Sequence, residues 1–553
     1  GITGAGVALD AASRGLSTAL VEAGDFASGT SSKSSKMVHG GIRYLQQREF
    51  RLVYENLAER QRLLENAPHL VSPVPFLIPL FGKAGVVNRS VARAYRSALW
   101  LYDLTGGWRI GRRHQRVTRE QALEHLPTLR ADQLVAGFLY WDARTDDARL
   151  TLCVLRTAAL DYGAVAVNHT RVEALVHGAD GHVTGARVAP EGADPFDVRA
   201  RVVVNAAGVW ADQVRTLDEG TDPGSLRPAK GVHVTVPADA FPCDIAAVIP
   251  VRGDGRSIFV VSWGEQVYLG TTDTAYQGPL DDPSCGPEDV AYLLDAANAV
   301  TTRPLEAAQI TGIWSGLRPL LAPTAGHRAP SERTADLSRR HTVRAAPSGV
   351  VTVTGGKLTT YRKMAEDTVD VVVRELGRRD RCRTRSLALR GAAPVDAAAG
   401  GQPPTGSDES ATVADHLAGR YGAETPAVLA RAEGAPELLQ PLVPGLRYLG
   451  VEAVYAVEEE MATSLEDVLD RRTRASLRDA RATATAAPRV AELVGPLLGW
   501  DAERARREAD AYAARVRAAL DRAGLGHATA DGGGGASPGA ALGSAVSRPA
   551  DGR

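Results

Sequence analysis

Residues 1–22 read GITGAGVALDAASRGLSTALVE, which combines a glycine-rich turn, a helix of small residues and a short apolar run ending in Glu22. Gly1 and Gly4 allow backbone N–H groups to approach a pyrophosphate at the start of the helix, where the helix dipole favours negative charge. Glu22 follows at the place where an acidic side chain accepts hydrogen bonds from ribose hydroxyls. This order of turn, helix, strand and acid predicts half of a dinucleotide-binding α/β fold.

The same pattern does not distinguish NAD from FAD as the bound dinucleotide. A strand normally precedes such a glycine turn, whereas this sequence opens at Gly1 itself. We therefore expect the chain to be truncated, with the first strand of the fold missing.

The composition is typical of a large globular protein and argues against several classes of function. The chain has 553 residues, 44% of them hydrophobic, which is enough for two or three domains. Its 64 basic and 65 acidic side chains leave a net charge of −1, so no nucleic-acid partner is expected. The four cysteines are widely spaced without a CxxC pair, so neither a disulfide framework nor a metal site is expected. No apolar run approaches the roughly 20 residues of a membrane-spanning helix, so any membrane contact should be peripheral.

Strand-like runs alternate with helical segments along most of the chain. This alternation predicts an α/β cofactor domain interleaved with a mixed, β-rich substrate domain and followed by helices. A segment rich in Gly, Pro, Ala and Ser then predicts a linker, and a similar composition at the end of the chain predicts a disordered tail. The expected division is 1–55, 148–217 and 340–385 for the cofactor domain, 56–147 and 218–339 for the substrate domain, 386–410 for the linker, 411–524 for the helical domain and 525–553 for the tail.

Residues 30–45 read TSSKSSKMVHGGIRYL, a segment whose hydroxyls suit a phosphorylated cofactor and whose Arg and His suit a small anion. This stretch resembles the signature of the FAD-dependent glycerol-3-phosphate dehydrogenases of the respiratory, quinone-linked, aerobic bacterial type. Further stretches resemble the same family in the same order: NAAGVW at 205–210, GTTD at 270–273, SGLRP at 315–319, GGKLTTY at 355–361 and DVLDRRT at 467–473. The resemblance extends to about residue 520.

The resemblance implies FAD as the cofactor and a Rossmann-like fold of the glutathione reductase/D-amino-acid oxidase type. In such flavoproteins the helix that follows the 355–361 stretch points its N-terminus at the flavin ring. The positive end of its dipole would favour acceptance of hydride. The residues expected to bind FAD are Gly1, Gly4, Glu22, Thr30, Ser31, Ser32, Ser35, Ala207, Gly208, Gly355, Gly356, Leu358 and Thr359.

Cationic side chains in these motifs indicate a phosphorylated substrate. Guanidinium groups can bind phosphate oxygens in pairs, which makes Arg43 and Arg318 the strongest candidates. Lys357 and Tyr44 are additional donors. Arg318 lies between a glycine and a proline, which predicts a rigid turn. A structural ion pair remains an alternative for any single arginine.

A further arginine and two histidines are candidates for the chemistry. Arg339 resembles another active-site arginine of the family, although its neighbour Arg340 leaves the register open. A histidine is a suitable base near pH 7, and the resemblance favours His233 near the substrate hydroxyl and His39 near the flavin. The sequence leaves open which histidine is the base, and whether Asp273 orders the site or only a turn.

The resulting hypothesis is oxidation of sn-glycerol 3-phosphate to dihydroxyacetone phosphate by hydride transfer to FAD, with electrons passed to a membrane quinone. Three alternatives stay open. A glycerol-3-phosphate oxidase would share these motifs and use oxygen, and an amino- or hydroxy-acid oxidase would bind a carboxylate. A non-catalytic flavin-fold binding module is the third.

Two segments could form surfaces for partners. Residues 75–81 are apolar and punctuated by proline like a loop, and they precede arginines at helical spacing at 89, 93 and 96. Together they fit either docking on an anionic membrane or a core-facing helix with a solvated arginine edge. A peripheral position on the cytoplasmic face of the membrane, or a cytoplasmic one, is therefore expected. The charged helix expected around 458–474 could be a homodimer surface or merely solvated.

Overall fold

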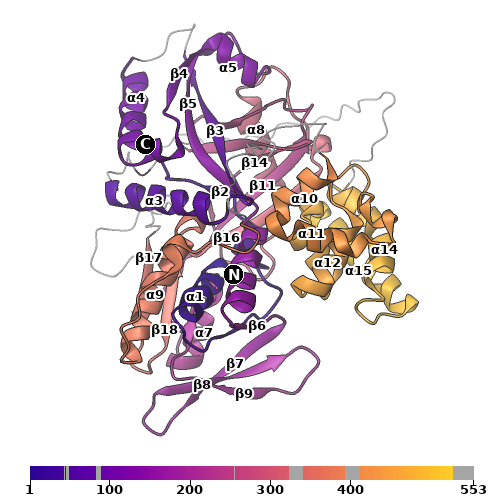
Figure 1. Cartoon of the computed structure of the whole chain (residues 1–553). Helices are drawn as coiled ribbons and strands as arrows, with labels where there is room; N and C mark the ends of the chain where they lie inside the picture. Colours follow the sequence, from indigo (N-terminus) through magenta and orange to yellow (C-terminus); the bar gives the residue numbers. More distant parts are fainter. Residues whose placement is uncertain are drawn as a thin grey trace, which may run out of the picture.

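The computed structural model describes residues 1–42, 44, 49–82, 89–253, 256–322, 340–392 and 412–526. Figure 1 shows an α/β region around α1 and α9, a large sheet above it flanked by α3 to α5, and a group of C-terminal helices at one side. None of the helices in these described ranges combines the length and the hydrophobicity that crossing a bilayer requires.

The α/β region is built around the N-terminal helix, as the glycine-rich start of the sequence predicts. Helix α1 packs between α6 and α9, and short parallel strand pairs lie beside it. Strand β1 pairs with β6, whereas β10 pairs with β18, which pairs in turn with β17. The bounds are α1 Ile2–Ser13, β1 Ala19–Val21, α6 Asp147–Arg156, β6 Val165–Val167, β10 Val204–Asn205, β17 His341–Ala345, β18 Val351–Gly355 and α9 Tyr361–Glu375.

A small antiparallel sheet extends from this region at the bottom of Figure 1, with α7 beside it. Its strands are β7 Thr170–His177, β8 Val183–Pro190 and β9 Phe196–Arg199, and α7 spans Ala211–Glu219.

The large sheet is ten-stranded, with the order β15-β11-β14-β13-β12-β3-β5-β2; β16 also pairs with β11, and β4 with β5. Strand β2 joins it although its residues lie in the predicted cofactor segment 1–55. The bounds are β2 Met37–Val38, β3 Val71–Phe81, β4 Gln115–Thr118, β5 Leu134–Thr145, β11 Ala229–Pro237, β12 Ala246–Pro250, β13 Ser257–Trp263, β14 Gln266–Gly270, β15 Thr274–Ala275 and β16 Gly312–Arg318.

The loop-like interpretation of residues 75–81 is wrong, because these residues form the second half of strand β3. Alternate residues of a strand direct their N–H groups to the same edge, so the prolines at 73, 75 and 79 leave one edge short of donors. One neighbour, β12, pairs with β3 only at Phe76 and Leu77, whereas β5 pairs along its length. Phe76 and Leu77 are fully buried, so this segment is core and not a membrane contact.

Both faces of the large sheet are covered by helices. Helices α3 and α4 pack on one face, where Leu57 and Leu99 join the aromatic side chains of β3 and β5. The other face shares one core with α8 and the C-terminal helices, including Val468, Val490 and Tyr512. The bounds are α3 Phe50–Asn66, α4 Arg89–Leu104, α5 Arg119–His125, α8 Pro287–Asn298, α10 Val413–Tyr421, α11 Thr425–Leu429, α12 Gly450–Glu460, α13 Ala475–Arg478, α14 Ala480–Val494 and α15 Ala502–Arg522.

The expected single helix over 458–474 is also wrong. Helix α12 ends at Glu460, its C-cap Met461 has a left-handed φ of 57°, and a separate π-helical turn follows over Asp467–Arg472. Only part of this run is solvated: Glu458 and Glu459 are exposed, whereas Arg471 and Arg472 are buried and bind Asp25 of the α/β region. A run of charges therefore marks an internal boundary between two parts of the chain.

The predicted linker and tail are described only in part. Leu387 and Leu389 are buried in the core around α1, so the start of the 386–410 segment is packed structure. Leu525 is buried too, and its carbonyl accepts a hydrogen bond from Arg481. Residues 393–411 and 527–553 lie outside the described residues, and the domain boundaries stay a prediction.

The boundary between α6 and the C-terminal helices is held by a buried ion pair. Arg149 binds both carboxylate oxygens of Glu460, one of them at 2.7 Å. Burial alone would raise the pKa of Glu460, but the charge and hydrogen bonds of Arg149, with Arg156 nearby, keep that pKa below its ordinary value. Removing one partner of such a pair leaves an uncompensated buried charge.

We therefore expect Arg149→Met to lower the free energy of unfolding by about 3–5 kcal/mol, measured by urea denaturation. Arg187→Met is the matched control, because it removes an exposed pair with Asp197 and should change that free energy by at most about 1 kcal/mol. Equal losses in the two variants would contradict this account.

Candidate active site

The N-terminus of α1 and the hydroxyl-rich segment lie against each other. The Ile2 N–H donates to Ser31 Oγ at 2.8 Å, and Ser31 belongs to a short 3-10 turn over Thr30–Ser32. Glu22 follows β1 and lies 3.1 Å from the Gly1 nitrogen. Gly1, Glu22 and the Thr30–Ser32 turn, which were predicted to bind one dinucleotide, are thus brought together.

The turn after β10 lies on the same side of the candidate site as the N-terminus of α1. A Cβ added at Gly4 would lie 3.7 Å from the side chains of Ala206 and Leu20, which is ordinary van der Waals contact and shows that the start of α1 lies beside these segments. Gly208 has a left-handed φ of 62°, and a Cβ there would meet nothing within 4 Å. Ala207 donates its N–H to Asn205 Oδ1 at 3.2 Å, which fixes the turn beside this open space. Open space next to a helix N-terminus fits the pyrophosphate of a dinucleotide.

The segment after β18 forms the other side. Gly355 and Gly356 have φ values of 75° and 80°, and a Cβ would lie 2.6 Å from the Arg340 carbonyl oxygen or 2.3 Å from the Met364 sulfur, respectively. Only glycine fits both positions. The following 3-10 turn, η7 (Leu358–Thr360), contacts the hydroxyl-rich segment through the His39 N–H, which donates to Thr359 Oγ1 at 3.1 Å.

His233 lies in the middle of β11 and is 2% exposed. Its Nε2 is 2.8 Å from Ser35 Oγ, and its ring stacks on Trp314 with centroids 4.7 Å apart. A Cβ at Gly270 would lie 2.0 Å from the His233 Cδ2, so that glycine makes room for the ring. Nδ1 is buried and has no hydrogen-bond partner in the described parts of the chain, so one hydrogen-bonding position of the ring is unused there.

His233 is neutral at pH 7. Burial lowers its pKa well below the ordinary value, and the positive charges of Lys36 and Arg318 lower it further. A neutral imidazole can accept a proton, but a pKa well below the ordinary value makes it a weaker proton acceptor than an unperturbed histidine.

Arg318 ends strand β16 and does not lie in the predicted turn. Its guanidinium is 3.2 Å from Asp273 Oδ1 and donates to Thr271 Oγ1 at 3.1 Å. A Cβ at Gly231 would lie 2.5 Å from Nη2, so this glycine lets the guanidinium lie across β11. Asp273 therefore orders the arginine, which was one of the two roles that the sequence left open.

The remaining predicted substrate residues are placed in part. The Lys357 Nζ lies 3.7 Å from the centroid of the Tyr44 ring, a cation–π contact that joins two of the predicted donors. Arg43 and Arg339 lie outside the described residues.

Sequence reasoning missed the aromatic side chains and the lysine behind His233. Trp314 pairs with His233 across β11 and β16, and Tyr268 meets both rings edge-on. Lys36 is buried, with Nζ 4.5 Å from a Trp314 ring centroid, and burial, followed by the charge of Arg474, lowers its pKa to about 8. The signal that could have found Trp314 is the strand register, because it lies four residues before Arg318 on one strand.

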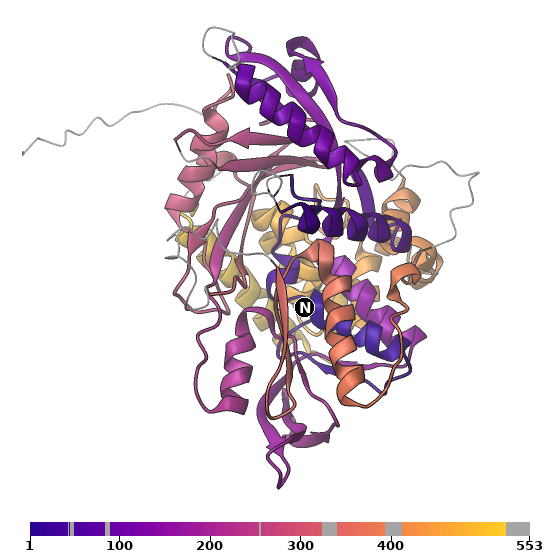
Figure 2. The same cartoon turned by 90° about the vertical axis from the view of Figure 1, so that its left-hand side faces the viewer.

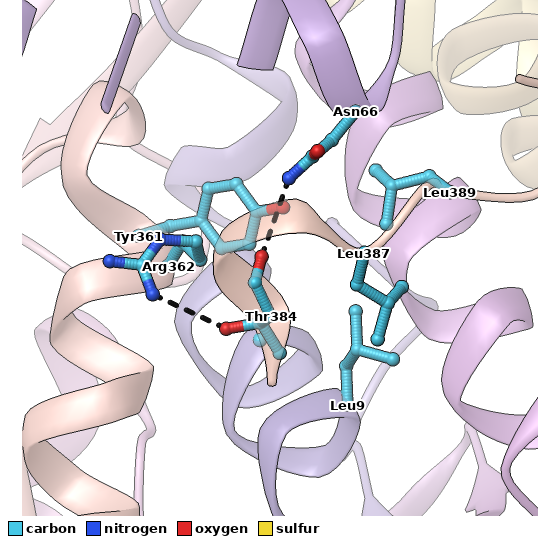
Figure 3. A pocket seen from close by; sticks show the side chains of 8 residues that line it. Leu9, Asn66, Tyr361, Arg362, Thr384, Leu387 and Leu389 are labelled. Carbon is cyan, nitrogen blue, oxygen red and sulfur yellow. Dashed lines mark hydrogen bonds between the residues drawn. The ribbon is translucent and has the colours of Figure 1, made fainter. Parts of the chain in front are cut away.

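A separate small cavity lies between α1, α3 and α9 (Figure 3). Asn66, Tyr361, Arg362 and Thr384 line it together with leucine side chains. Its volume of about 10 Å³ holds roughly one water molecule, so it is a packing defect and not the cofactor site.

Comparisons with known proteins agree with this arrangement. Residues 1–362 match the family model of the FAD dependent oxidoreductases, and residues 382–505 match the C-terminal domain of alpha-glycerophosphate oxidase. Glycerol-3-phosphate dehydrogenase 2 of Mycobacterium tuberculosis is 43% identical over 94% of this chain and 87% of its own length. The chain belongs to the FAD-dependent glycerol-3-phosphate dehydrogenase family.

Other members of the family are similar over most of this chain. The human mitochondrial glycerol-3-phosphate dehydrogenase is 36% identical over 91% of this chain and 70% of its own length. The crystal structure of the Bacillus halodurans glycerol-3-phosphate dehydrogenase, complexed with FAD, has a TM-score of 0.73 and 32% identity, covering 94% of each chain. The predicted fold class, the C-terminal helical domain and FAD as the cofactor of this oxidoreductase are thereby confirmed.

We expect Glu22→Gln to weaken FAD binding by roughly 1.5–3 kcal/mol, the size of a hydrogen bond to a charged group. The reason is that the carboxylate is placed to accept from the ribose hydroxyls. The measurement is the dissociation constant of FAD, from the fluorescence of released flavin. Glu65→Gln, on the outer face of α3, is the control, and an equal weakening in both variants would contradict the assignment.

Proposed function

We propose that this chain oxidises sn-glycerol 3-phosphate to dihydroxyacetone phosphate and passes the electrons to a membrane quinone. The observation that carries the proposal is the pairing of β11 with β16, which places a neutral His233 near the fixed cation Arg318. A base beside an anion-binding guanidinium fits a phosphorylated alcohol. The names of the mycobacterial and mitochondrial relatives, which are glycerol-3-phosphate dehydrogenases, support the same substrate.

Arg318 binds the phosphate group of the substrate. Its contacts with Asp273 and Thr271 fix the plane of the guanidinium before substrate arrives, so little side-chain entropy is lost on binding. Lys357, held against Tyr44, contributes a second positive charge. Arg43 and Arg339 stay predicted members of this set.

His233 accepts the proton of the C2 hydroxyl at Nδ1 as the C2 carbonyl forms. Its Nε2 stays bonded to Ser35, which fixes the plane of the ring together with the stack on Trp314. The residues around the start of α1 and after β18 would hold FAD, which would supply the acceptor for the hydride from C2. The two bonds that break are thus C2–H and O–H, and the product is the ketone.

We expect His233→Ala to lower the limiting rate of flavin reduction by roughly 100-fold to 10,000-fold, as for loss of a general base, with a small effect on substrate affinity. Arg318→Ala should mainly raise the KM for glycerol 3-phosphate, by the equivalent of roughly 2–3 kcal/mol. The measurement is anaerobic stopped-flow reduction of the bound flavin, with glycerol 3-phosphate as titrant.

Arg344→Ala, an exposed arginine on β17, is the control for loss of positive charge. Parental protein whose bound FAD stays oxidised with glycerol 3-phosphate would reject the substrate. Reduction by amino or hydroxy acids instead would favour the carboxylate alternative. Mixing the reduced enzyme with air or with a soluble quinone then separates a peroxide-forming oxidase from a dehydrogenase.

Exposed apolar side chains on α3 and α4, called the α3/α4 patch below, support the peripheral membrane position that we propose for the cytoplasmic face. Phe50 and Tyr54 of α3 are 46% and 53% exposed, and Trp100 and Leu104 of α4 are 44% and 73% exposed. The two helices lie beside each other in both views (Figures 1 and 2). Exposed arginines, including Arg96, accompany them, and a mixed apolar and basic surface suits an anionic bilayer. A homodimer stays a prediction of the sequence.

We expect the double variant Trp100→Ser/Leu104→Ser to bind anionic lipid vesicles at least roughly 10-fold more weakly, because burial of each large apolar side chain contributes about 1.5–3 kcal/mol. Co-sedimentation with vesicles measures this. Leu160→Ser is the matched control, since Leu160 is 57% exposed but lies beside α6, away from the α3/α4 patch. If the double variant sediments with vesicles as well as the parental protein does, α4 does not contribute to membrane binding.

A further inference from the structure

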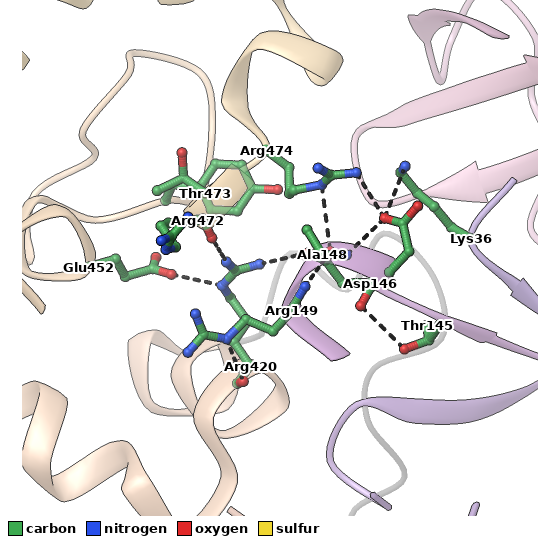
Figure 4. A network of polar contacts seen from close by, with 12 residues as sticks. Lys36, Thr145, Asp146, Ala148, Arg149, Arg420, Glu452, Arg472, Thr473 and Arg474 are labelled. Atoms are coloured by element: carbon green, nitrogen blue, oxygen red, sulfur yellow. Dashed lines mark hydrogen bonds and ion pairs between the residues drawn. The ribbon is translucent and has the colours of Figure 1, made fainter. Parts of the chain in front are cut away.

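Arg474 belongs to the C-terminal helical part, yet its side chain lies inside the α/β region. The residue has a left-handed φ of 69°, which separates the turn at Asp467–Arg472 from α13, and its side chain is 1% exposed. Figure 4 shows it directed at the start of α6. The guanidinium donates to Asp147 Oδ1 at 2.9 Å and to the carbonyl oxygen of Ser32.

Asp147 connects Arg474 to the hydroxyl-rich segment. Its Oδ2 accepts from the Ser34 N–H at 2.9 Å and from the Ser34 Oγ at 2.7 Å. Its Oδ1 also lies 3.4 Å from the Lys36 Nζ. The aspartate is fully buried, so these contacts are not weakened by water.

The hydroxyl-rich segment that Asp147 binds also contacts His233 and the aromatic side chains around it. Ser35 Oγ is 2.8 Å from the His233 Nε2, and the Ser35 carbonyl accepts from the Tyr268 hydroxyl at 2.8 Å. The neighbouring carbonyl of Ser34 accepts from the Trp314 Nε1 at 3.2 Å. Residues 32–36 are therefore fixed between Asp147 and Arg474 on one side and the aromatic side chains around His233 on the other.

We propose that Arg474 is a positioning residue for His233, acting through Asp147 and the segment 32–36. This inference rests on the function proposed above, in which His233 accepts the substrate proton. The C-terminal helices thereby contribute to the reaction without contacting the substrate.

The alternative is that Arg474 only attaches the C-terminal helices to the rest of the chain. The two roles differ in what happens near His233. Without the guanidinium, the Ser32 carbonyl loses this donor and Asp147 keeps Lys36 as its one ion-pair partner among the described residues, so the segment that carries Ser35 can shift. A displacement of about 1 Å far from the reacting atoms can slow an enzyme by roughly 100-fold. A merely structural role would lower stability and leave the reduction rate of the folded enzyme unchanged.

The test is a double-mutant cycle in the FAD-loaded enzyme with Arg474→Met and Ser35→Ala. We expect each single variant to lower the limiting rate of flavin reduction by roughly 10-fold to 100-fold, with the affinity for glycerol 3-phosphate changed less than about two-fold. The double variant should be no slower than the slower single variant, because both act on one path. Rate losses that multiply in the double variant would overturn the proposal.

Arg156→Met is the matched control. Arg156 spans the same boundary, donating to Glu424 and to the Tyr455 hydroxyl at 2.9 Å each, but has no contact with residues 32–36 in the described structure. We expect the parental rate of flavin reduction in this variant. An Arg156→Met enzyme as slow as Arg474→Met would show that any damage at the boundary slows the reaction, which also overturns the proposal.

A second readout needs neither substrate nor turnover. The ¹⁵N chemical shift of the His233 Nε2 reports its bond to Ser35, so it should move in Arg474→Met towards the value in Ser35→Ala and stay parental in Arg156→Met. An unmoved shift overturns the positioning role, whereas a parental enzyme whose FAD is not reduced rejects the proposed function alone. If Arg474→Met fails to fold, Asp147→Asn takes its place in the cycle with the same expected results.

Discussion

The antiparallel pairing of β11 with β16 is the constraint on which the active site depends. It places His233 opposite Trp314 and Ala229 opposite Arg318, so the register of one pair of strands fixes both the imidazole and the guanidinium. A slip of one residue would turn every side chain of a strand to the other face. The glycines at 231 and 270 are part of the same constraint, because any Cβ there would displace one of the two functional groups.

The sequence was informative where local chemistry decides the structure. Gly1 and the acid Glu22, predicted to share one cofactor site, lie beside each other, and both glycines at 355 and 356 have left-handed backbone, whereas their binding of FAD stays a prediction. Two other patterns misled. Prolines normally end strands. Strand β3 tolerates them because its edge towards β12 is paired over only two residues, and the sequence alone does not reveal that pairing.

The charged run around 458–474 misled for a related reason. A cluster of arginines and acids is usually solvated. Its composition does not reveal that Arg472 and Arg474 pair with Asp25 and Asp147, which lie in a distant part of the chain. Buried pairs of this kind contribute little net stability compared with apolar packing, but a missing partner is strongly unfavourable. They therefore select one way of docking the C-terminal helices, which is the geometry that brings Arg474 to the segment around Ser34.

The core that the large sheet shares with the last helices has a consequence for synthesis of the protein. Val232 and Val260 of the sheet are buried in the same cluster as Val490 and Tyr512, more than two hundred residues later in the chain. While the ribosome is still translating that interval, this side of the sheet lacks the cover of the C-terminal helices and presents apolar surface to solvent. Long chains whose cores join distant segments fold through such exposed intermediates, so a chaperone that shields this side until α14 and α15 emerge would raise the yield of active enzyme.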